Sequence, residues 1–222
     1  MTVSGNTSKK SFDTYDSFLV EGRIDRFTKI FARYELFKMV IDLPGDIVEC
    51  GVFKGSGLFF WAKIIQIFNP LSCRKVVGFD TFSGVPKTVR AEKDRAGSIM
   101  HHNYSYILQI IKEKAQELNL TGRIEFVLGD ASRTIPKYAK NNPGFRIALL
   151  NLDFDVYEPT LAALEKFYDR IVGGGIVTID EYAVANWRES DAVDEFIKGK
   201  KLELKSLPWA LTPTAYFKKP LA

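Results

Sequence analysis

The chain has 222 residues, of which 46% are hydrophobic, and this length and composition fit one α/β domain with a sizeable core. Its formal net charge of +4 is mildly basic, and the lysines do not alternate with aromatic residues, so a solvated surface is favoured over a nucleic-acid-binding face. The two cysteines lack metal-binding spacing and indicate a reducing location. No apolar run is long enough to span a bilayer and the N-terminus is polar, so we expect a cytoplasmic protein without a membrane partner.

The first 24 residues are expected to form a tail or lid. Residues 1–11 are rich in Ser, Thr, Gly and Lys, which predicts disorder, and apolar residues then recur at helical spacing as far as Leu19. This short amphipathic piece could cover a site, form an interface or pack on the domain. A stronger helical pattern follows over residues 25–41 and ends at Pro44-Gly45.

The stretch DIVECGVFKGSG, residues 46–57, joins an apolar strand, an acidic residue (Glu49), a glycine turn and the start of an apolar helix. Glycines let the backbone approach a ligand closely, and a helix N-terminus presents free N–H groups. The spacing G-x-x-x-G-x-G is neither the dinucleotide motif nor a P-loop, since Lys54 precedes Gly55. It resembles the first motif of class I S-adenosylmethionine (SAM) methyltransferases, whose acidic residue faces the cationic methionine end of the cofactor. The alternative is a turn with only a packing role.

The rest of the chain alternates predicted strands and helices. Strands are expected over residues 75–82, 123–131, 145–155 and 176–182, and helices over residues 56–68, 106–118, 157–172 and 189–198, with a short helix or turn over residues 132–140. Two last strands, residues 201–207 and 214–219, follow without a helix between them. This order predicts a doubly wound, Rossmann-like α/β sheet, mostly parallel, with one antiparallel strand near the C-terminus.

Residues 83–105 are highly charged and have no clean periodicity. A loop of this length in a compact domain is usually a lid, a binding loop or disordered, so we expect a mobile substrate loop. His101 and His102 lie in it; one of them could touch substrate or act as a base, although a solvated loop histidine is more common.

Carboxylates lie at or near the C-terminal end of every predicted parallel strand. They are Glu49, Asp80, Asp130, the pair Asp153 and Asp155, and the pair Asp180 and Glu181. Ligands of an open parallel sheet bind outside that edge, and a carboxylate in an apolar strand is costly unless it is paired or faces a ligand. Asp80 could accept both ribose hydroxyls and Asp130 the adenine amino group of an adenosine. The alternative for each residue is that it starts a turn or caps a helix.

The carboxylates in the second half of the sheet suggest metal chemistry. Asp153, Asp180 and Glu181 offer hard oxygen ligands, which suit Mg²⁺ or a similar divalent cation. Such a metal could bind two vicinal hydroxyls of a substrate and lower the pKa of one. Asp155, two residues beyond Asp153, could then accept the proton as general base. The alternative is that Asp180 and Glu181 only cap the next helix.

Five strings carry a more specific resemblance: DIVECGVFKGSG, VVGFDTFSGVP, LGDASRTIP, LNLDFDVYEPT and GGGIVTIDEY. They are similar to the macrocin (TylF-type) O-methyltransferase family, SAM- and Mg²⁺-dependent enzymes that methylate sugar hydroxyls, many on glycosylated natural products. The resemblance runs from about Asp25 to the C-terminus and makes residues 1–222 one methyltransferase domain. It implies Asp155 and Asp153 as catalytic residues and Asp153, Asp180 and Glu181 as metal ligands. The cofactor-binding residues that we expect are Glu49, Gly51, Gly55, Ser56, Asp80, Phe82, Ser83, Asp130, Ala131 and Asp153.

Two departures from the family bear on the acceptor and metal sites. Members often have Asp-Asp where this chain has Asp180-Glu181, and the N-terminal region is short. Acceptor identity is therefore the least transferable property. Tyr157 and Tyr182 could line the acceptor site or pack. Two tryptophans, Trp187 and Trp209, are expected in the core or the pocket wall.

The sequence is therefore interpreted as a SAM- and divalent-metal-dependent O-methyltransferase of a sugar or sugar conjugate, which could form a homo-oligomer. An NAD-dependent oxidoreductase is the first alternative, disfavoured by the absent G-x-G-x-x-G motif. A methyltransferase of nucleic acid or of another small molecule is the second, and salt-dependent RNA binding would support the nucleic-acid form. A SAM-binding protein without turnover is the third.

Overall fold

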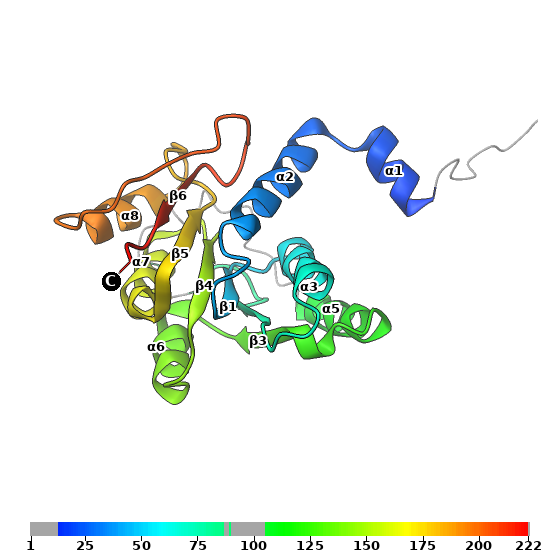
Figure 1. The fold of residues 1–222 in the computed structure, drawn as a ribbon, viewed down its shortest axis with the longest axis horizontal. Helices are drawn as coiled ribbons and strands as arrows, with labels where there is room; N and C mark the ends of the chain where they lie inside the picture. Colours follow the sequence, from blue (N-terminus) through cyan, green and yellow to red (C-terminus); the bar gives the residue numbers. More distant parts are fainter. Residues whose placement is uncertain (1–12, 87–88, 90–104, 222) are drawn as a thin grey trace, which may run out of the picture.

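One six-stranded sheet runs through the part of the chain that the structure, a computed structural model, describes, namely residues 13–86, 89 and 105–221 (Figure 1). Its strands are β1 (Asp46–Cys50), β2 (Val76–Asp80), β3 (Ile124–Leu128), β4 (Ile147–Leu152), β5 (Ile171–Ile179) and β6 (Ala215–Lys218). They lie in the order β3-β2-β1-β4-β5-β6, and only β6, antiparallel to β5, breaks the parallel arrangement. The predicted fold class is confirmed.

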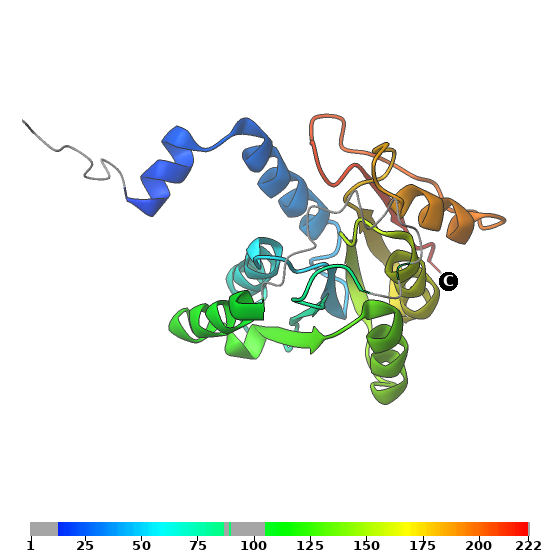
Figure 2. The same ribbon diagram turned by 180° about the vertical axis from the view of Figure 1, so that it is seen from behind.

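Helices cover both faces of the sheet (Figures 1 and 2). They are α1 (Thr14–Glu21), α2 (Ile24–Lys38), α3 (Ser56–Phe68), α5 (Ser105–Glu117), α6 (Ala131–Asn141), α7 (Tyr157–Phe167) and α8 (Glu189–Ile197), with 3-10 turns η1 (Thr121–Arg123) and η2 (Tyr168–Arg170). Apolar residues of α2, α3 and α5 join one core cluster, and those of α6, α7 and α8 join the other. Successive strand residues alternate between the clusters, as Ile47 and Val48 do, because side chains alternate across a strand.

The helix α1 makes little contact with the rest of the molecule. None of its residues, all of which are described, is buried, and Tyr15 and Val20 are 69% and 66% exposed. The two ribbon views show α1 projecting beyond α2, away from the sheet. The helix α2, in contrast, buries Ala32, Leu36 and Phe37 against the sheet. A tail or lid role for the first 24 residues stays a prediction.

Two predictions for the C-terminal half of the chain are wrong: one strand does not form, and one helix ends earlier than expected. Residues 201–207 do not form a strand; within the described chain they pair with the sheet only at Lys205, through an isolated antiparallel bridge to Tyr216. The sequence of this segment resembles that of an edge strand, because half-buried leucines alternate with exposed charged residues there. The helix predicted to reach residue 172 ends at Phe167, since η2 and the early start of β5 follow it.

Some predictions concern residues outside the described part. Most of the expected substrate loop, including His101 and His102, lies there, as does the segment before residue 13. Among the described residues, the helices are all too short or too polar to cross a membrane. A cytoplasmic location and a homo-oligomer stay predictions.

Candidate active site

A cavity of about 540 Å³ opens at the C-terminal edge of the sheet. Its walls include the ends of β1 and β4, neighbours that lie where the strand order reverses, which is the usual ligand-binding position of such sheets. The predicted site residues that line it are Glu49, Gly51, Ser56, Asp80, Ala131, Asp153, Asp155, Asp180 and Glu181. The remaining predicted site residues are not part of the wall, but each is adjacent in sequence to a residue that is. They are Gly55, Phe82, Ser83 and Asp130.

Gly51 allows the turn after β1 to pass against the end of β4. Its φ is +93°, and a Cβ placed there would lie 1.9 Å from the backbone oxygen of Asp153. The Asp153 N–H donates to the Cys50 carbonyl oxygen at 2.8 Å across the same contact. Glycine is thus required by both the backbone conformation and the close approach.

Glu49 is a buried carboxylate with unused hydrogen-bonding capacity. Its Oε1 lies 3.9 Å from Nη2 of Arg33, and its Oε2, also buried, accepts no hydrogen bond from the described residues. Burial raises the pKa of Glu49 to about 7, against the opposing effect of Arg33 and Lys29. Gly57 lets α3 approach it, because a Cβ there would be 1.9 Å from Oε1. A buried acceptor at the cavity wall fits a ligand ammonium group.

Asp80 fastens the glycine turn to the end of β2. Its Oδ2 accepts from the backbone N–H groups of Val52 and Phe53 at 2.8 and 2.9 Å, and its Oδ1 accepts from that of Phe82 at 2.7 Å. An ionised carboxylate offers roughly four acceptor positions, so about one is left for a ligand hydroxyl. Binding of ribose by Asp80 stays a prediction, but holding the turn is a role that the sequence alone did not reveal.

Asp130 caps a helix, which was the alternative explanation given above for each carboxylate at a strand end. It is the N-cap of α6 and accepts from Ser132 N at 3.0 Å and from Ser132 Oγ at 2.7 Å. Its neighbours Gly129 and Ala131 line the cavity instead. Contact between Asp130 and an adenine therefore stays a prediction, and the cap explains its position without a ligand.

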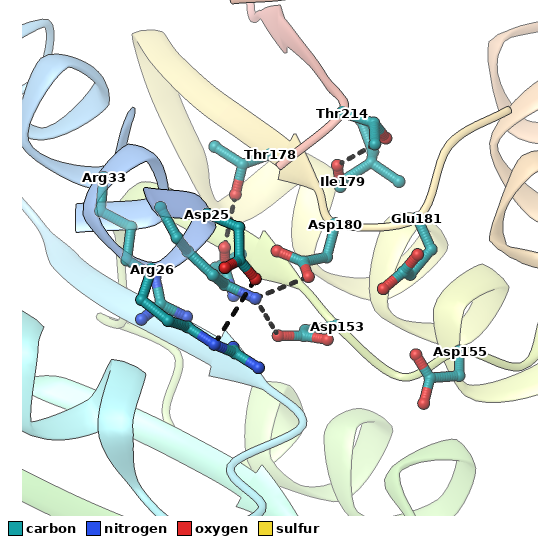
Figure 3. A network of polar contacts seen from close by, with 12 residues as sticks. Asp25, Arg26, Arg33, Asp153, Asp155, Thr178, Ile179, Asp180, Glu181 and Thr214 are labelled. Carbon is teal, nitrogen blue, oxygen red and sulfur yellow. Dashed lines mark hydrogen bonds and ion pairs between the residues drawn. The ribbon is translucent and has the colours of Figure 1, made fainter. Parts of the chain in front are cut away.

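The carboxylates of Asp153 and Asp180 point toward one place from the ends of β4 and β5 (Figure 3). The Nζ of Lys29, from α2, lies 2.7 Å from Asp180 Oδ2 and 3.6 Å from Asp153 Oδ2. Burial and the neighbouring Asp180 raise the pKa of Asp153 well above its usual range, although Lys29 opposes this. The buried Oδ1 of Asp180 has no hydrogen-bond partner among the described residues.

Asp155 and Glu181 lie farther along the same wall of the cavity (Figure 3). Burial, followed by repulsion from Glu181 and Asp180, raises the pKa of Asp155 to about 7. Burial and Asp180 likewise raise the pKa of Glu181. Asp155 is therefore a much stronger base than an ordinary aspartate and is partly ionised at neutral pH.

As the side chains stand, the arrangement does not fit a divalent metal. Carboxylate oxygens are the donors that Mg²⁺ prefers, so the chemistry of Asp153, Asp180 and Glu181 is suitable. However, no three His, Cys, Asp or Glu side chains among the described residues converge in a metal-holding geometry. The ammonium group of Lys29 lies where Asp153 and Asp180 meet. The carboxylates of Asp153 and Asp180 are thus paired with the side chain of Lys29.

Glu189, the first residue of α8, is a site residue that the sequence did not reveal. It is fully buried; its Oε1 accepts from Phe154 N at 2.8 Å and from Asp155 N at 3.2 Å, and its Oε2 accepts from Glu181 N at 2.9 Å. One carboxylate thus joins the loops after β4 and β5. It also supports Asp155 at φ +66°, a conformation that is unfavourable for a side chain larger than glycine.

Three more unforeseen residues, all of them basic, come from α2. Lys29 and Arg33 line the cavity with Arg26, which precedes Lys29 by one helical turn. The sequence did contain a signal for them, because basic residues at i, i+3 and i+7 share one face of a helix. Glu189 gave no such signal, since an acidic residue at the start of a helix is ordinary.

The predictions for two tyrosines and two tryptophans near the site are confirmed only in part. The hydroxyls of Tyr157 and Tyr182 donate to Glu195 and Asp194 of α8, and neither ring lines the cavity. This supports packing over acceptor binding. Trp187 is part of the cavity wall, as expected. Trp209 is 48% exposed and outside that wall, so its predicted place in the core or pocket is wrong.

Comparison with solved structures places the fold among the class I SAM methyltransferases. Calicheamicin methyltransferase CalS11 superposes with a TM-score of 0.78 and 29% sequence identity, over 92% of this chain and 83% of that one. The O-methyltransferase NovP, 24% identical, shares the fold with a TM-score of 0.72 over 87% of this chain and 80% of that one. Residues 20–219 match the family Macrocin-O-methyltransferase (TylF), and the chain belongs to this family, as the sequence strings predicted.

Two curated relatives are named as O-methyltransferases. One, from Streptomyces olivaceus, is 8-demethyl-8-(2,3-dimethoxy-alpha-L-rhamnosyl)-tetracenomycin-C 4'-O-methyltransferase, 32% identical over 163 residues, which are 69% of this chain and 58% of the relative. The other, from Micromonospora griseorubida, is mycinamicin III 3''-O-methyltransferase, 29% identical over 158 residues, 69% of this chain and 61% of the relative. The chain thus spans about three-fifths of the length of these relatives.

Proposed function

We propose that this protein transfers the methyl group of SAM to a hydroxyl of a sugar carried by a small molecule. One observation carries the proposal: a single cavity holds both the glycine turn with the buried Glu49 and the basic carboxylate Asp155. The glycine turn and Glu49 suit the binding of a cationic cofactor. The carboxylate of Asp155 suits the removal of a proton from an acceptor. Membership of the macrocin O-methyltransferase family supports the combination.

The cofactor would lie along the first half of the sheet. Glu49 would accept from the ammonium group of its methionine part, and Gly51 would let the backbone come close to it. Asp80, beside the turn, would accept from the ribose. When bound, SAM supplies an electrophilic methyl group on a sulfonium.

Asp155 would act as general base on the acceptor. It would take the proton of the sugar hydroxyl, so that the hydroxyl oxygen could accept the methyl group that bound SAM would supply. Its pKa of about 7 lies close to the operating pH, where a general base is most effective. Glu189 would hold Asp155 in place through the Asp155 N–H. Most of the rate enhancement would come from placing the two reactants together.

A divalent cation bound by Asp153, Asp180 and Glu181 is a separate part of the proposal. Its support is the hard oxygen chemistry of the three side chains and the unpartnered buried Oδ1 of Asp180. The present position of Lys29 opposes it. Titration with Mn²⁺ tests this part independently of any acceptor, and lack of binding would contradict it.

The acceptor is proposed as a sugar already joined to another group. The support is that the two named relatives act on a rhamnosyl-tetracenomycin and on mycinamicin III. One related solved structure is named as a TDP-rhamnose 3'-O-methyltransferase, so a nucleotide sugar belongs in the same test. A panel of deoxysugar nucleotides and glycosides, analysed by mass spectrometry for one added methyl group, distinguishes the two.

The same assay separates an enzyme from a SAM-binding protein without turnover. The wild-type protein should methylate at least one sugar conjugate, and Asp155→Asn should lose this activity while it still binds S-adenosylhomocysteine. Binding of S-adenosylhomocysteine with equal product formation by both proteins would show that Asp155 is not the base. Cofactor binding without any product across the panel would favour the non-catalytic alternative.

A further inference from the structure

Arg33 is a buried base with unused hydrogen-bonding capacity. It comes from α2 and lines the cavity, yet its side chain is only 8% exposed (Figure 3). Its Nε is buried and donates no hydrogen bond to the described residues. The carboxylate oxygen that lies near it, Oε1 of Glu49, is 3.9 Å from its Nη2, which is too long for a hydrogen bond. A guanidinium group is always charged and has five N–H donors, so Arg33 can still bind an anion.

Glu49 has unused capacity of the opposite sign at the same place. Its side chain is 2% exposed, and its buried Oε2 accepts no hydrogen bond from the described residues. Gly57 keeps the space beside both groups open, because a Cβ there would lie 1.9 Å from Glu49 Oε1 and 2.8 Å from Arg33 Nη2. A buried acceptor and a buried donor thus lie side by side in the cavity wall. A ligand that satisfies both carries a cation and an anion close together.

An α-amino acid carries this pair of charges. Its ammonium and carboxylate groups are bonded to the same carbon atom, so a ligand whose ammonium group reaches Glu49 brings its carboxylate to the same part of the wall. A carboxylate moved there from water is costly unless a cation meets it. A guanidinium group meets a carboxylate with two parallel hydrogen bonds, which is the strongest pairing that side chains offer such a group.

The other basic side chains of the described cavity wall are less suited to this carboxylate. They are Arg26, Lys29 and Lys54. The Nζ of Lys29 is 2.7 Å from Asp180 Oδ2 and is therefore already paired. The side chain of Arg26 is 64% exposed, and the Nζ of Lys54 lies over an aromatic ring, 5.1 Å from its centroid. Arg33 is distinguished from all three as the buried base with an unpaired N–H.

We propose that Arg33 binds the carboxylate of the cofactor's amino-acid end and makes the site selective for a cofactor that carries an intact α-amino acid. The inference rests on the SAM-binding part of the proposed function and adds the residue that recognises the second charge of the cofactor. Glu49 receives the ammonium group, and Gly57 leaves room for both contacts. An analogue without the carboxylate leaves Arg33 buried and unpaired, so it binds more weakly.

The experiment is calorimetric titration with S-adenosylhomocysteine and with its decarboxylated analogue, which keeps the adenosine, the sulfur and the ammonium group. Three proteins are compared: the wild type, Arg33→Met and the control Arg26→Met. Arg26 lines the cavity from the same helix, and its removal also deletes one positive charge. Loss of Arg33 alters the surroundings of Glu49 as well. Both ligands carry the ammonium group, however, so this effect cancels in the ratio of the two affinities.

The wild type and Arg26→Met should prefer S-adenosylhomocysteine to the analogue by at least about tenfold, which corresponds to roughly 1.4 kcal/mol. In Arg33→Met the preference should fall below about threefold, because the carboxylate no longer has its partner. A preference that stays near the wild-type value in Arg33→Met would assign the carboxylate to the free N–H groups at the start of α3 and overturn the proposal.

Two other results would also decide against Arg33. Equal affinities of the wild type for the two ligands, or an equal loss of preference in Arg26→Met, would overturn the proposal and leave the proposed methyltransferase function intact. Failure of the wild type to bind either ligand would overturn both.

A second measurement uses the wild-type protein alone and covers the case in which Arg33→Met does not fold. Nuclear magnetic resonance of protein labelled with ¹⁵N in its arginines reports each Nε–H group. Saturating S-adenosylhomocysteine should move the Nε–H proton signal of Arg33 downfield, because this N–H gains a charged acceptor, and the decarboxylated analogue should not. The signal of Arg26 should respond equally to both ligands. An equal response of Arg33 to both ligands, or none to either, would overturn the proposal.

Discussion

Replacement of Glu189 by glutamine probes how the loops that carry Asp155 and Glu181 are held together. The wild-type carboxylate accepts from three backbone N–H groups, of Phe154, Asp155 and Glu181. A glutamine of the same shape keeps one oxygen, which can still accept from Phe154 and Asp155. Its NH₂ group then faces the N–H of Glu181, so two donors meet and one buried N–H is left unpaired.

The expected loss in the free energy of unfolding follows from that unpaired group. A buried donor without a partner costs about 1–3 kcal/mol, and the same range is expected for Glu189→Gln at neutral pH. The pH dependence has a definite sign. Burial and the nearby Asp155 raise the pKa of Glu189 to about 8, so the folded protein binds this proton more tightly than the unfolded chain.

The stability that the Glu189 proton provides is fully present below the ordinary glutamate pKa and is lost as the pH rises to about 8. Glutamine carries no such proton. The difference in stability between the wild type and Glu189→Gln should therefore be larger at about pH 5.5 than at about pH 8.5. Urea unfolding at both pH values, monitored by tryptophan fluorescence, measures it.

The matched control is Glu195→Gln on the same helix, because Glu195 is exposed and bonds only to a surface tyrosine among the described residues. It should change stability by less than about 0.5 kcal/mol. Once an acceptor is known, Glu189→Gln should also lower kcat while the KM for SAM stays near the wild-type value. Equal stability of the two variants, or a stability difference that does not vary with pH, would refute the role assigned to Glu189.

Further predictions concern the base and the glycine turn. Asp155→Asn should abolish methyl transfer but leave S-adenosylhomocysteine affinity within about threefold, as a competition assay would show. In the wild type, kcat/KM should rise with pH through about 7, because Asp155 has to be ionised to accept the proton; a profile that is flat from pH 5 to 9 would contradict this. Gly51→Ala should destabilise the protein by about 2–4 kcal/mol in urea unfolding, since its Cβ would overlap the backbone oxygen of Asp153. A cost below that of Gly144→Ala, whose Cβ would meet open space, would contradict the steric explanation.

The fold was predictable because its determinants are local and periodic. The apolar runs of β1 and β4 and the helical spacing in α2 identify elements, and alternation of strands and helices restricts their arrangement. The same logic brought most of the predicted site residues to the wall of one cavity, since parallel strands bring their C-terminal ends to one edge. The predicted strand over residues 201–207 failed because alternation describes which side chains are buried, whereas pairing depends on a partner that the sequence does not identify.

The interior of the site was less predictable because it depends on contacts between distant residues. Lys29 meets Asp180 across 151 positions of the chain, and Glu189 meets Phe154 across 35. A charged residue on a helix gives no indication of which strand end it will face. Likewise, a strand-end aspartate such as Asp130 has the same sequence signal whether it caps a helix or binds a ligand.

The decisive measurement is calorimetric titration of the protein with S-adenosylhomocysteine and, separately, with NAD⁺. Cofactor binding can be measured before the acceptor is known. We expect micromolar affinity for S-adenosylhomocysteine, at least about tenfold weaker binding by the isosteric variant Glu49→Gln, and no heat of binding with NAD⁺. Absence of S-adenosylhomocysteine binding, or a preference for NAD⁺, would contradict the proposed methyltransferase function.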